Sequence, residues 1–295
     1  MPPQPHIHAE LDEPRNALAA GRNLGSLLPE HRRPEFTERP PFRAPTPSTT
    51  EVARNRIVAD CLIGQEGSDG RMERVELAQK TVLIESGHSL EYVYFPETAV
   101  IAFLNGKGNT ALMEVATVGR EGVVGLQCFL GTEFPSLRAI VKVRGTALRM
   151  SAANFRSWAA THTVLHSQLL SYTGAFIAQL TQTATCNAVH LVEERCARWL
   201  LLVQDRSGSN EVEVTHDFLA SLLGVRRAGI TTAMNSLKER RLLSYSRGRI
   251  TVTNRPGLER VTCACYHHMR TAEERLSTRQ ILSGGFQGVR PTADA

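Results

Sequence analysis

The sequence predicts an α+β protein with an N-terminal antiparallel β-roll (jelly roll), a long dimerisation helix and a C-terminal winged helix-turn-helix. Three patterns support this fold class. Between residues 75 and 150, short runs rich in Val, Ile, Phe and Tyr alternate with turn residues, which is typical of antiparallel sheets. Residues 165–180 carry apolar side chains at helical spacing. Residues 215–253 combine two short helices, a tight turn and a hairpin pattern.

The length and composition are those of a globular protein with more than one domain. The chain has 295 residues, of which 42% are hydrophobic and 21% charged, and domains usually hold about 100 to 200 residues. No apolar run approaches the roughly 20 residues that a membrane helix needs, so we expect no membrane association. The N-terminus lacks the pattern of a secretory signal, which predicts a cytoplasmic protein whose six cysteines are thiols.

The N-terminal segment differs in composition from the rest of the chain. Ten of the fourteen prolines lie between Pro2 and Pro47, and the segment has almost no periodic apolar pattern. We predict a mostly flexible extension there, in which any helix around Leu18 to Leu28 is transient. The predicted divisions are an extension at 1–50, a β-roll at 51–150, a long helix at 151–186, a winged helix-turn-helix at 187–255 and a helical C-terminal extension and tail at 256–295.

Six runs form the predicted β-roll. Gly, Pro, Asn and Ser clusters separate them, and no helical pattern intervenes, so the strands should pair antiparallel. The runs are Val75–Ile84, Tyr92–Phe95, Val100–Leu104, Leu112–Val118, Ala139–Val143 and Ala147–Met150.

The pattern changes to helical spacing after Ser151. Five side chains recur at intervals of three and four and therefore share one stripe of a long helix: Leu165, Leu169, Tyr172, Phe176 and Leu180. We expect this stripe to pair with its copy in a second subunit, and the alternative is that it packs within one chain. A further helix is predicted over His190–Asp205, before the breaker Ser207-Gly-Ser-Asn.

Residues 215–253 carry the strongest functional signal. Thr215 can cap a helix that Gly224 ends in a left-handed turn. A second helix is predicted from Arg226 to Arg240, and the hairpin over Leu243–Thr253 follows it directly, with its turn at Arg247-Gly248. This order of elements predicts a winged helix-turn-helix.

Charge favours a DNA-binding role for this segment. From Arg226 to Arg255 there are eight basic residues and the single acid Glu239, whereas the whole chain has a net charge of +5. Phosphate binding needs several positive groups on one side, while a solvated helical face usually mixes signs. We predict DNA contacts from the second helix and the wing: Arg226, Arg227, Ala228, Thr231, Thr232, Asn235, Arg247 and Arg249. The alternative is a compact module for protein contacts.

The predicted order of β-roll, long helix and winged helix resembles the Crp/Fnr family of bacterial transcription regulators over roughly residues 52–270. The most specific part of the resemblance is the helix-turn-helix sequence Thr215-His-Asp-Phe-Leu-Ala-Ser-Leu-Leu-Gly-Val-Arg-Arg-Ala-Gly-Ile230. The resemblance implies a homodimer on a palindromic operator, a β-roll that senses an effector, and RNA polymerase as a partner when the regulator activates. In one family member an Arg-Glu pair and an Arg four residues after the Glu contact bases. The matching positions are Arg227, Ala228 and Thr232, so the resemblance implies a different operator.

The effector cassette departs further from the family pattern. Gly119-Arg-Glu-Gly-Val-Val-Gly125 resembles its start, but Leu126 stands where the family has a ribose-binding Glu, and Leu137-Arg138 stand where it has the phosphate-binding Arg-Ser pair. A cyclic phosphate without those partners is poorly compensated, so we expect no tight cyclic AMP binding and leave the effector unknown. The candidate pocket residues are Gly119, Arg120, Glu121, Gly122, Gly125 and Arg138.

We predict no cofactor and no metal ion. The family's iron-sulfur type uses N-terminal cysteines, and residues 1–60 contain none. The one compact group of soft ligands, Cys263-Ala-Cys-Tyr-His-His268, matches no standard zinc spacing. Its thiols are expected to be buried core residues, and a metal or redox role for Cys263, Cys265, His267 or His268 stays open.

An enzyme is not expected, because no catalytic motif occurs. The glycines at 119–125 do not form a dinucleotide-binding pattern, no phosphate-binding P-loop is present, and the β region offers only His88 as an imidazole ligand. The second hypothesis is a ligand- or redox-sensing β-roll that acts through a protein partner. It predicts little salt dependence of DNA association, whereas a DNA-binding regulator predicts a steep one.

Overall fold

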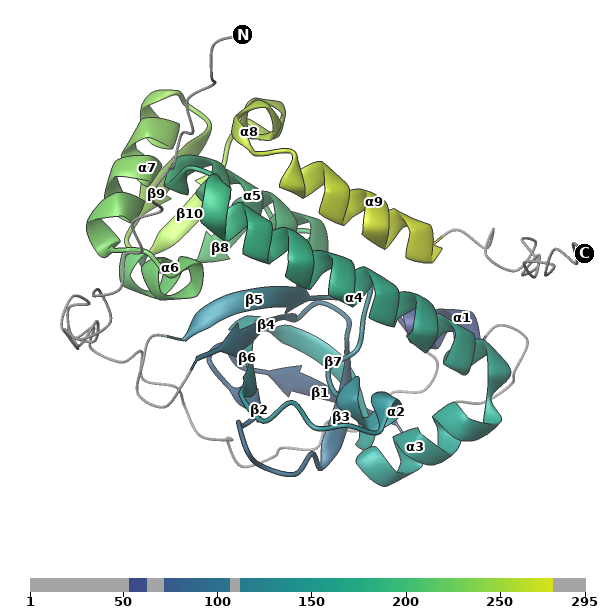
Figure 1. The fold of residues 1–295 in the computed structure, drawn as a ribbon. Coiled ribbons are helices and arrows are strands. Elements are labelled where there is room, and N and C mark those ends of the chain that lie inside the picture. The colour runs from purple at the N-terminus through teal and green to yellow at the C-terminus, as the bar shows by residue number, and fades with distance from the viewer. Residues whose placement is uncertain (1–52, 63–71, 107–111, 278–295) are drawn as a thin grey trace, which may run out of the picture. The chain divides into compact units, whose positions relative to one another are not determined.

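The computed structural model describes residues 53–62, 72–106 and 112–277 (Figure 1). The predicted extension at 1–50 and the helix around Leu18 to Leu28 lie outside the described residues. The described part combines antiparallel sheets with helices, as the sequence predicts.

Two antiparallel sheets form the β-roll, and this confirms the predicted sheet type. Their strand orders are β1-β7-β3 and β2-β6-β4-β5. The strands are β1 (Glu73–Leu77), β2 (Val82–Ile84), β3 (Tyr92–Pro96), β4 (Val100–Asn105), β5 (Met113–Val118), β6 (Leu137–Val143) and β7 (Gly145–Ser151). The run Val75–Ile84, predicted as one strand, is divided between both sheets. Lys80, with φ 69°, lies in the turn between the two strands, and such a turn ends strand pairing.

The four-stranded sheet is buried on both faces. Ile101 and Phe103 of β4 belong to the core of the β-roll, whereas Ala102 and Leu104 belong to a second core. Successive side chains of a strand point to opposite faces, so a strand covered on both sides reads as a continuous apolar run. This explains the sequence Val-Ile-Ala-Phe-Leu in β4.

Four helices pack on the β-roll or on one another: α1 (Arg56–Leu62), α2 (Gln127–Leu130), α3 (Ala152–Thr161) and α4 (Thr163–Val189). The segment predicted as one helix over 151–186 is two helices. His162 has an extended backbone, with φ −105° and ψ 101°, and its side chain accepts a hydrogen bond from the Leu165 N–H. An extended residue that caps the next helix interrupts the helical hydrogen bonds, so the long helix begins at Thr163.

The remaining described elements form the helix-turn-helix and its flanks: α5 (Val192–Ser207), β8 (Glu211–Glu213), α6 (His216–Leu223), α7 (Arg227–Glu239), β9 (Leu243–Ser246), β10 (Arg249–Val252), α8 (Arg255–Val261) and α9 (Cys265–Ser277). Figure 1 shows α9 running beside α4. The second core contains residues of α5, α6, α7 and the strands of the wing, and Trp199 and Leu219 are among its buried side chains. Among the described residues, no helix combines the length and hydropathy that a bilayer crossing requires.

Candidate nucleic-acid interface

The helix-turn-helix is built by local signals that the sequence carries. The Thr215 side chain accepts a hydrogen bond from the Phe218 N–H at 3.2 Å and caps α6. Gly224 ends α6 with φ 63°, a conformation that costs a residue with a Cβ roughly 1–2 kcal/mol. Arg226 is the extended residue before α7. The predicted cap, turn and second helix are confirmed.

Helix α7 has one buried and one exposed face. Its buried residues are Ile230, Ala233, Met234 and Leu237. The opposite face exposes Arg227, Ala228, Thr232 and Asn235. This is the usual pattern of an amphipathic surface helix, and in the second helix of a helix-turn-helix it leaves a polar face available for contacts outside the domain.

Thr231 differs from the other predicted contact residues of α7 because it is half-buried. Its hydroxyl donates to the Arg227 carbonyl at 3.1 Å and lies 3.2 Å from the His216 Nδ1. The His216 ring stacks on Tyr245 of β9 with ring centroids 4.5 Å apart. Thr231 therefore connects α6, α7 and the wing, and its hydroxyl is occupied inside the domain.

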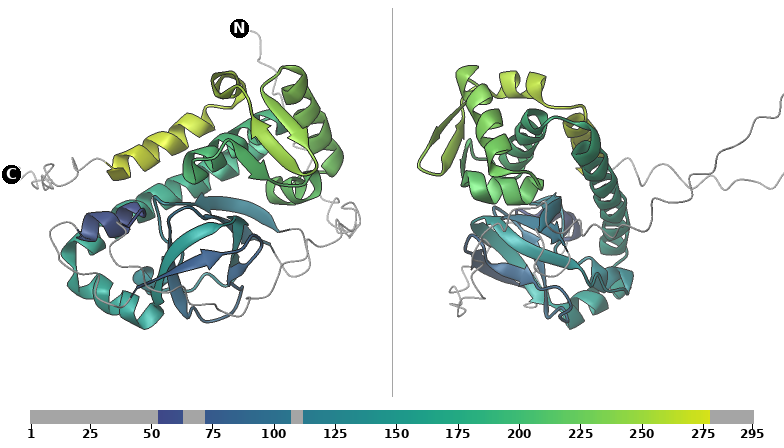
Figure 2. Two further views of the ribbon diagram at one scale, coloured as in Figure 1. Left: turned by 180° about the vertical axis from the view of Figure 1, so that it is seen from behind. Right: turned by 60° about the vertical axis from the view of Figure 1, so that its left-hand side comes forward.

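The wing is a two-stranded hairpin beside α7 (Figure 2). Strands β9 and β10 pair antiparallel, and β10 also pairs with β8. Arg247 and Gly248 form the turn with φ 48° and 77°, the positive values that a tight two-residue hairpin of this kind requires at both positions. The turn presents the exposed Arg247 side chain at the tip of the wing.

The basic residues of this segment divide into two groups. Four form ion pairs: Arg227 with Asp217 at 3.4 Å, Arg240 with Glu193 at 2.8 Å, Arg249 with Glu213 at 3.1 Å, and Arg255 with Asp205 at 2.7 Å. Arg226, Lys238, Arg241 and Arg247 are exposed and form no ion pair with another described residue. The sequence count of eight cations thus overstates the free positive charge, and Arg249 is partly neutralised by its acidic neighbours.

The apolar stripe of α4 is packed within its own chain, so the assignment of Leu165, Leu169, Tyr172, Phe176 and Leu180 to a dimer contact is corrected. Leu165 and Leu169 are 0% exposed in the core of the β-roll, and Leu180 packs at its margin. The Phe176 ring meets Phe103 of β4 at 5.3 Å. Helical spacing identifies a buried stripe, but the β-roll rather than a second subunit covers it.

The opposite face of α4 is exposed and contains no charged residue. Helix α4 as a whole has no Asp, Glu, Lys or Arg. Leu170 and Ile177 are each 54% exposed and lie seven residues apart. Gly174 between them has open space where a Cβ would be, and Thr181 and Ala184 continue the face. This spacing is that of a helix-pairing seam.

The glycines of the predicted effector cassette pack against protein side chains. A Cβ on Gly122 would lie 2.3 Å from the Tyr172 ring, and one on Gly119 would lie 2.8 Å from Arg206. Glu121 is buried and accepts hydrogen bonds from the Gly119 N–H at 2.9 Å and from Arg206 Nε at 2.8 Å. Side chains of α4 and α5 therefore occupy the inner side of this turn.

The other cassette residues are spread along the β-roll. Arg120 is exposed. Gly125 has φ 115°, and a Cβ there would meet Val93. Arg138 forms an ion pair with Glu85 at 2.5 Å. In the sheet, Arg138 of β6 lies opposite Leu104 of β4. Val118, the residue before Gly119, lies opposite Ile101 of β4. Arg138 and the glycine turn thus lie at different points along β4, and Arg138 already has a carboxylate partner.

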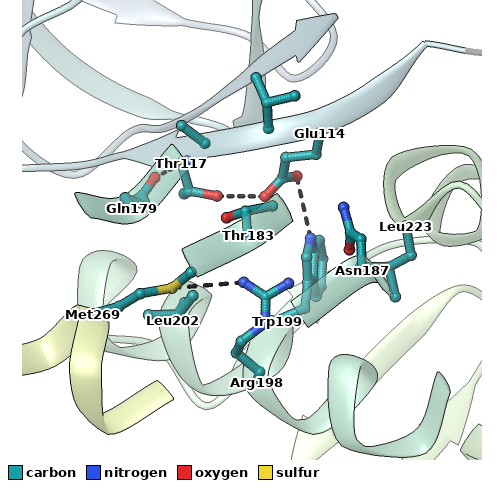
Figure 3. Close-up of a pocket in the computed structure, with 12 residues that line it drawn as sticks. Glu114, Thr117, Gln179, Thr183, Asn187, Arg198, Trp199, Leu202, Leu223 and Met269 are labelled. Carbon is teal, nitrogen blue, oxygen red and sulfur yellow. Dashed lines mark hydrogen bonds between the residues drawn. The ribbon is translucent and has the colours of Figure 1, made fainter. Parts of the chain in front are cut away.

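A buried polar cluster connects the β-roll with α5 (Figure 3). Lys142 Nζ donates to Glu114 at 2.8 and 3.0 Å, and Trp199 Nε1 donates to the same carboxylate at 3.2 Å. Burial lowers the pKa of Lys142 to about 8, although Glu114 opposes this. The cavity beside the cluster is about 10 Å³, room for about one water and no larger ligand.

Sequence reasoning missed contacts between residues far apart in the chain. The Glu114–Lys142–Trp199 cluster and the Arg206–Glu121 pair each depend on strand and helix packing, and no local motif marks them. Four possible metal ligands also come together, namely Cys186, His190, Cys263 and Cys265. The sequence shows Cys263 and Cys265 close together, but it does not show that Cys186 of α4 and His190 after that helix lie beside them. His267 and His268 are exposed and lie outside this group.

The fold and this interface define a β-roll protein with a C-terminal winged helix-turn-helix, the architecture of the Crp/Fnr regulators. Residues 194–261 match the family model described as the Crp-like helix-turn-helix domain. No curated protein sequence matches the chain significantly. The chain therefore has the Crp/Fnr-type fold and carries a Crp-like helix-turn-helix domain, as its sequence resemblance indicates.

Solved structures share the fold at low sequence identity. FixK2 from Bradyrhizobium japonicum is 16% identical with a TM-score of 0.55, covering 65% of this chain and 98% of that one. A Crp/Fnr-family regulator from Eubacterium rectale is 13% identical with a TM-score of 0.53, covering 70% and 94%. TTHB099, a Crp-family transcriptional regulator from Thermus thermophilus, is 16% identical with a TM-score of 0.53, covering 64% and 95%. These similarities concern the fold.

Proposed function

We propose that the protein is a homodimeric transcription regulator that binds a palindromic DNA operator through α7 and the wing. The observation that carries this proposal is the exposed polar face of α7, which lies beside a wing whose tip is Arg247. Four exposed cations that form no ion pair with another described residue lie within α7, next to its ends or at the tip of the wing: Arg226, Lys238, Arg241 and Arg247. Sequence-independent DNA affinity comes from such cations on phosphates, and specificity comes from side chains that reach base edges.

The residues divide into two roles. Arg227 and Asn235 lie on the exposed face of α7, where an Arg can bond a guanine edge and an Asn an adenine edge. The ion pair of Arg227 with Asp217 joins two side chains that are 65% and 68% exposed, so it contributes little and exchanges readily for a base contact. Arg226 and Arg247 are assigned to phosphates. Arg249 joins them when DNA displaces its acidic neighbours.

The proposed dimer forms through the exposed face of α4. Leu170, Ile177 and the small residues of the same face match a second copy of this helix, because two uncharged faces with heptad spacing can pair about a two-fold axis. A two-fold dimer would place two α7 helices against half-sites about one turn of DNA apart.

Cyclic AMP is not the proposed effector. A cyclic phosphate needs a cationic partner in a partly buried site, whereas Tyr172 and Arg206 fill the inner side of the glycine turn and Arg138 pairs with Glu85. A separate cleft of about 290 Å³ is lined by uncharged residues, including Phe134, Leu137 and Phe176. An effector in this cleft would be largely apolar.

The salt dependence of DNA binding tests the proposal. We expect the logarithm of the affinity for a duplex to fall steeply with the logarithm of salt concentration, by about 0.9 for each phosphate contact. Arg247→Ala should reduce the slope by about 1 for each lost contact. Arg144→Ala, which removes an equal charge from the exposed turn between β6 and β7, should leave the slope unchanged. Binding with little salt dependence would instead support the protein-partner hypothesis.

A further inference from the structure

We propose that Cys186, His190, Cys263 and Cys265 bind one zinc ion in a tetrahedral site. Cys186 lies in the last turn of α4, and His190 directly follows that helix. Cys263 lies between α8 and α9, and Cys265 is the first residue of α9. Three Cys and one His are a ligand set that structural zinc sites use.

The ligand atoms are already spaced for a single ion. All four lie within 4.8 Å of one another. The Cys186 and Cys263 Sγ atoms are 3.6 Å apart, and Cys265 Sγ is 3.4 Å from His190 Nδ1. In a tetrahedral site with Zn–S about 2.3 Å and Zn–N about 2.0 Å, ligand atoms are roughly 3.5–3.8 Å apart. Binding therefore requires only small side-chain shifts.

The surroundings of the site suit a structural ion. Cys186, Cys263 and Cys265 are 0%, 5% and 1% exposed, and His190 is half-buried. Gln182 of α4 donates its side-chain N–H to Cys265 Sγ at 2.9 Å. A donor to a ligand sulfur orients it and stabilises its thiolate form.

Two buried arginines near the site favour negatively charged ligands there. Arg195 and Arg198 of α5 are 6% and 5% exposed, and neither forms an ion pair with a described carboxylate. Arg195 donates through Nη2 to the Leu223 carbonyl and Arg198 through Nη1 to Met269 Sδ, but their buried Nε atoms have no hydrogen-bond partner among the described residues. Both guanidinium groups interact electrostatically with Cys186. Buried cations without counter-charge are costly, so the neighbouring thiols are the groups that can supply it.

Zinc binding would provide that counter-charge. The three thiols release their protons to solvent when the ion binds. Three thiolates, a neutral imidazole and Zn²⁺ then carry a net charge of −1 beside Arg195 and Arg198. Neutral thiols, or a disulfide between Cys186 and Cys263, would leave both arginines uncompensated.

The ion would link the two ends of the segment that contains the proposed DNA-binding helices. Cys186 and Cys263 are 77 residues apart, and the segment between them contains α5, the helix-turn-helix and the wing. A crosslink across so long a segment removes conformational freedom from the unfolded chain. The ion would thus stabilise the DNA-binding region and hold α9 against α4.

Metal analysis of the full-length protein tests the proposal. Protein stripped with a chelator, reloaded with Zn²⁺ alone and passed through gel filtration should retain one zinc per chain. With Co²⁺ in place of zinc, we expect the intense visible bands of a tetrahedral ion and a thiolate charge-transfer band. A protein that retains no zinc, or whose cobalt spectrum is that of a six-coordinate ion, would overturn the proposal.

Variants identify the ligands. Cys263→Ser and His190→Ala should lose the retained zinc and the zinc-dependent rise in thermal stability. Cys128→Ser removes a partly exposed thiol of α2 and should change neither. His190→Cys should keep one ion and strengthen the charge-transfer band. Because this variant still offers four ligands, it shows whether His190→Ala loses zinc through the missing ligand or through misfolding. Equal zinc content in Cys263→Ser and Cys128→Ser, or a Cys186–Cys263 disulfide in the isolated protein, would refute the site.

Discussion

The two faces of α4 lead to opposite predictions for leucine substitutions. Leu170 and Ile177 are each 54% exposed on the face assigned to the dimer, whereas Leu169 is 0% exposed in the core of the β-roll. We therefore expect Leu170→Ala/Ile177→Ala to weaken dimerisation while leaving the subunit folded. Leu169→Ala should instead lower the free energy of unfolding of the subunit.

The size of the effect follows from the exposed fractions. Full burial of a Leu or Ile side chain contributes about 1.5–3 kcal/mol, and about half of each side chain remains to be buried. Two such residues in each of two subunits contribute about 3–6 kcal/mol to association. The dimer dissociation constant should rise by roughly 100- to 20,000-fold. Leu169→Ala should cost about 2–5 kcal/mol of unfolding free energy, the range for a leucine deleted from a packed core.

Sedimentation velocity over a range of protein concentrations measures the dissociation constant, and circular dichroism reports whether each variant is folded. Leu130→Ala, which truncates a leucine of α2 that is 39% exposed, is the matched control and should dimerise like the unchanged protein. A double variant that dimerises as tightly as the unchanged protein would contradict the assignment of this α4 face to the dimer. An unchanged protein that is a monomer at the highest concentration tested would also contradict it.

Two further predictions concern the stability of the chain. Gly122→Ala should destabilise the protein by about 1–3 kcal/mol, because the added Cβ would lie 2.3 Å from the Tyr172 ring. Gly229→Ala should instead stabilise it by up to about 1 kcal/mol, because the Cβ has open space in α7. Thermal unfolding of the two variants measures both effects. The pKa of His216 is lowered from 6.5, first by burial and then by Arg227. Below pH 6.5 the unfolded chain therefore binds more protons than the folded one, so stability should fall as the pH falls, and urea unfolding of His216→Gln should show a smaller fall.

Local signals explain which parts of the fold could be predicted. Thr215, Gly224 and the Arg247-Gly248 turn act within four residues of their own positions, so the helix-turn-helix and its wing follow from the sequence. The alternation of short apolar runs and turns similarly predicted antiparallel sheets. Segments whose contacts are local can be placed without knowledge of the rest of the chain.

Contacts across the chain explain what was not predicted. Helical periodicity showed that Leu165 and Leu169 share a stripe, but the partner of a stripe depends on tertiary packing. The cysteines at 263 and 265 match no zinc spacing by themselves, because Cys186 lies 77 residues away from Cys263. Counting cations likewise could not show that Arg255 pairs with Asp205 while Arg247 has no such partner in the described part of the chain.

Selection of bound sequences from a genomic fragment pool tests the central claim most directly. The purified full-length protein should enrich a palindrome whose half-sites are about 10 base pairs apart from centre to centre. Arg227→Ala should lose the preference at particular positions in each half-site and keep salt-sensitive binding to unrelated DNA. Enrichment of the same palindrome by Arg227→Ala, or the absence of any enriched sequence at low salt, would contradict the assignment of α7 as the helix that reads the operator.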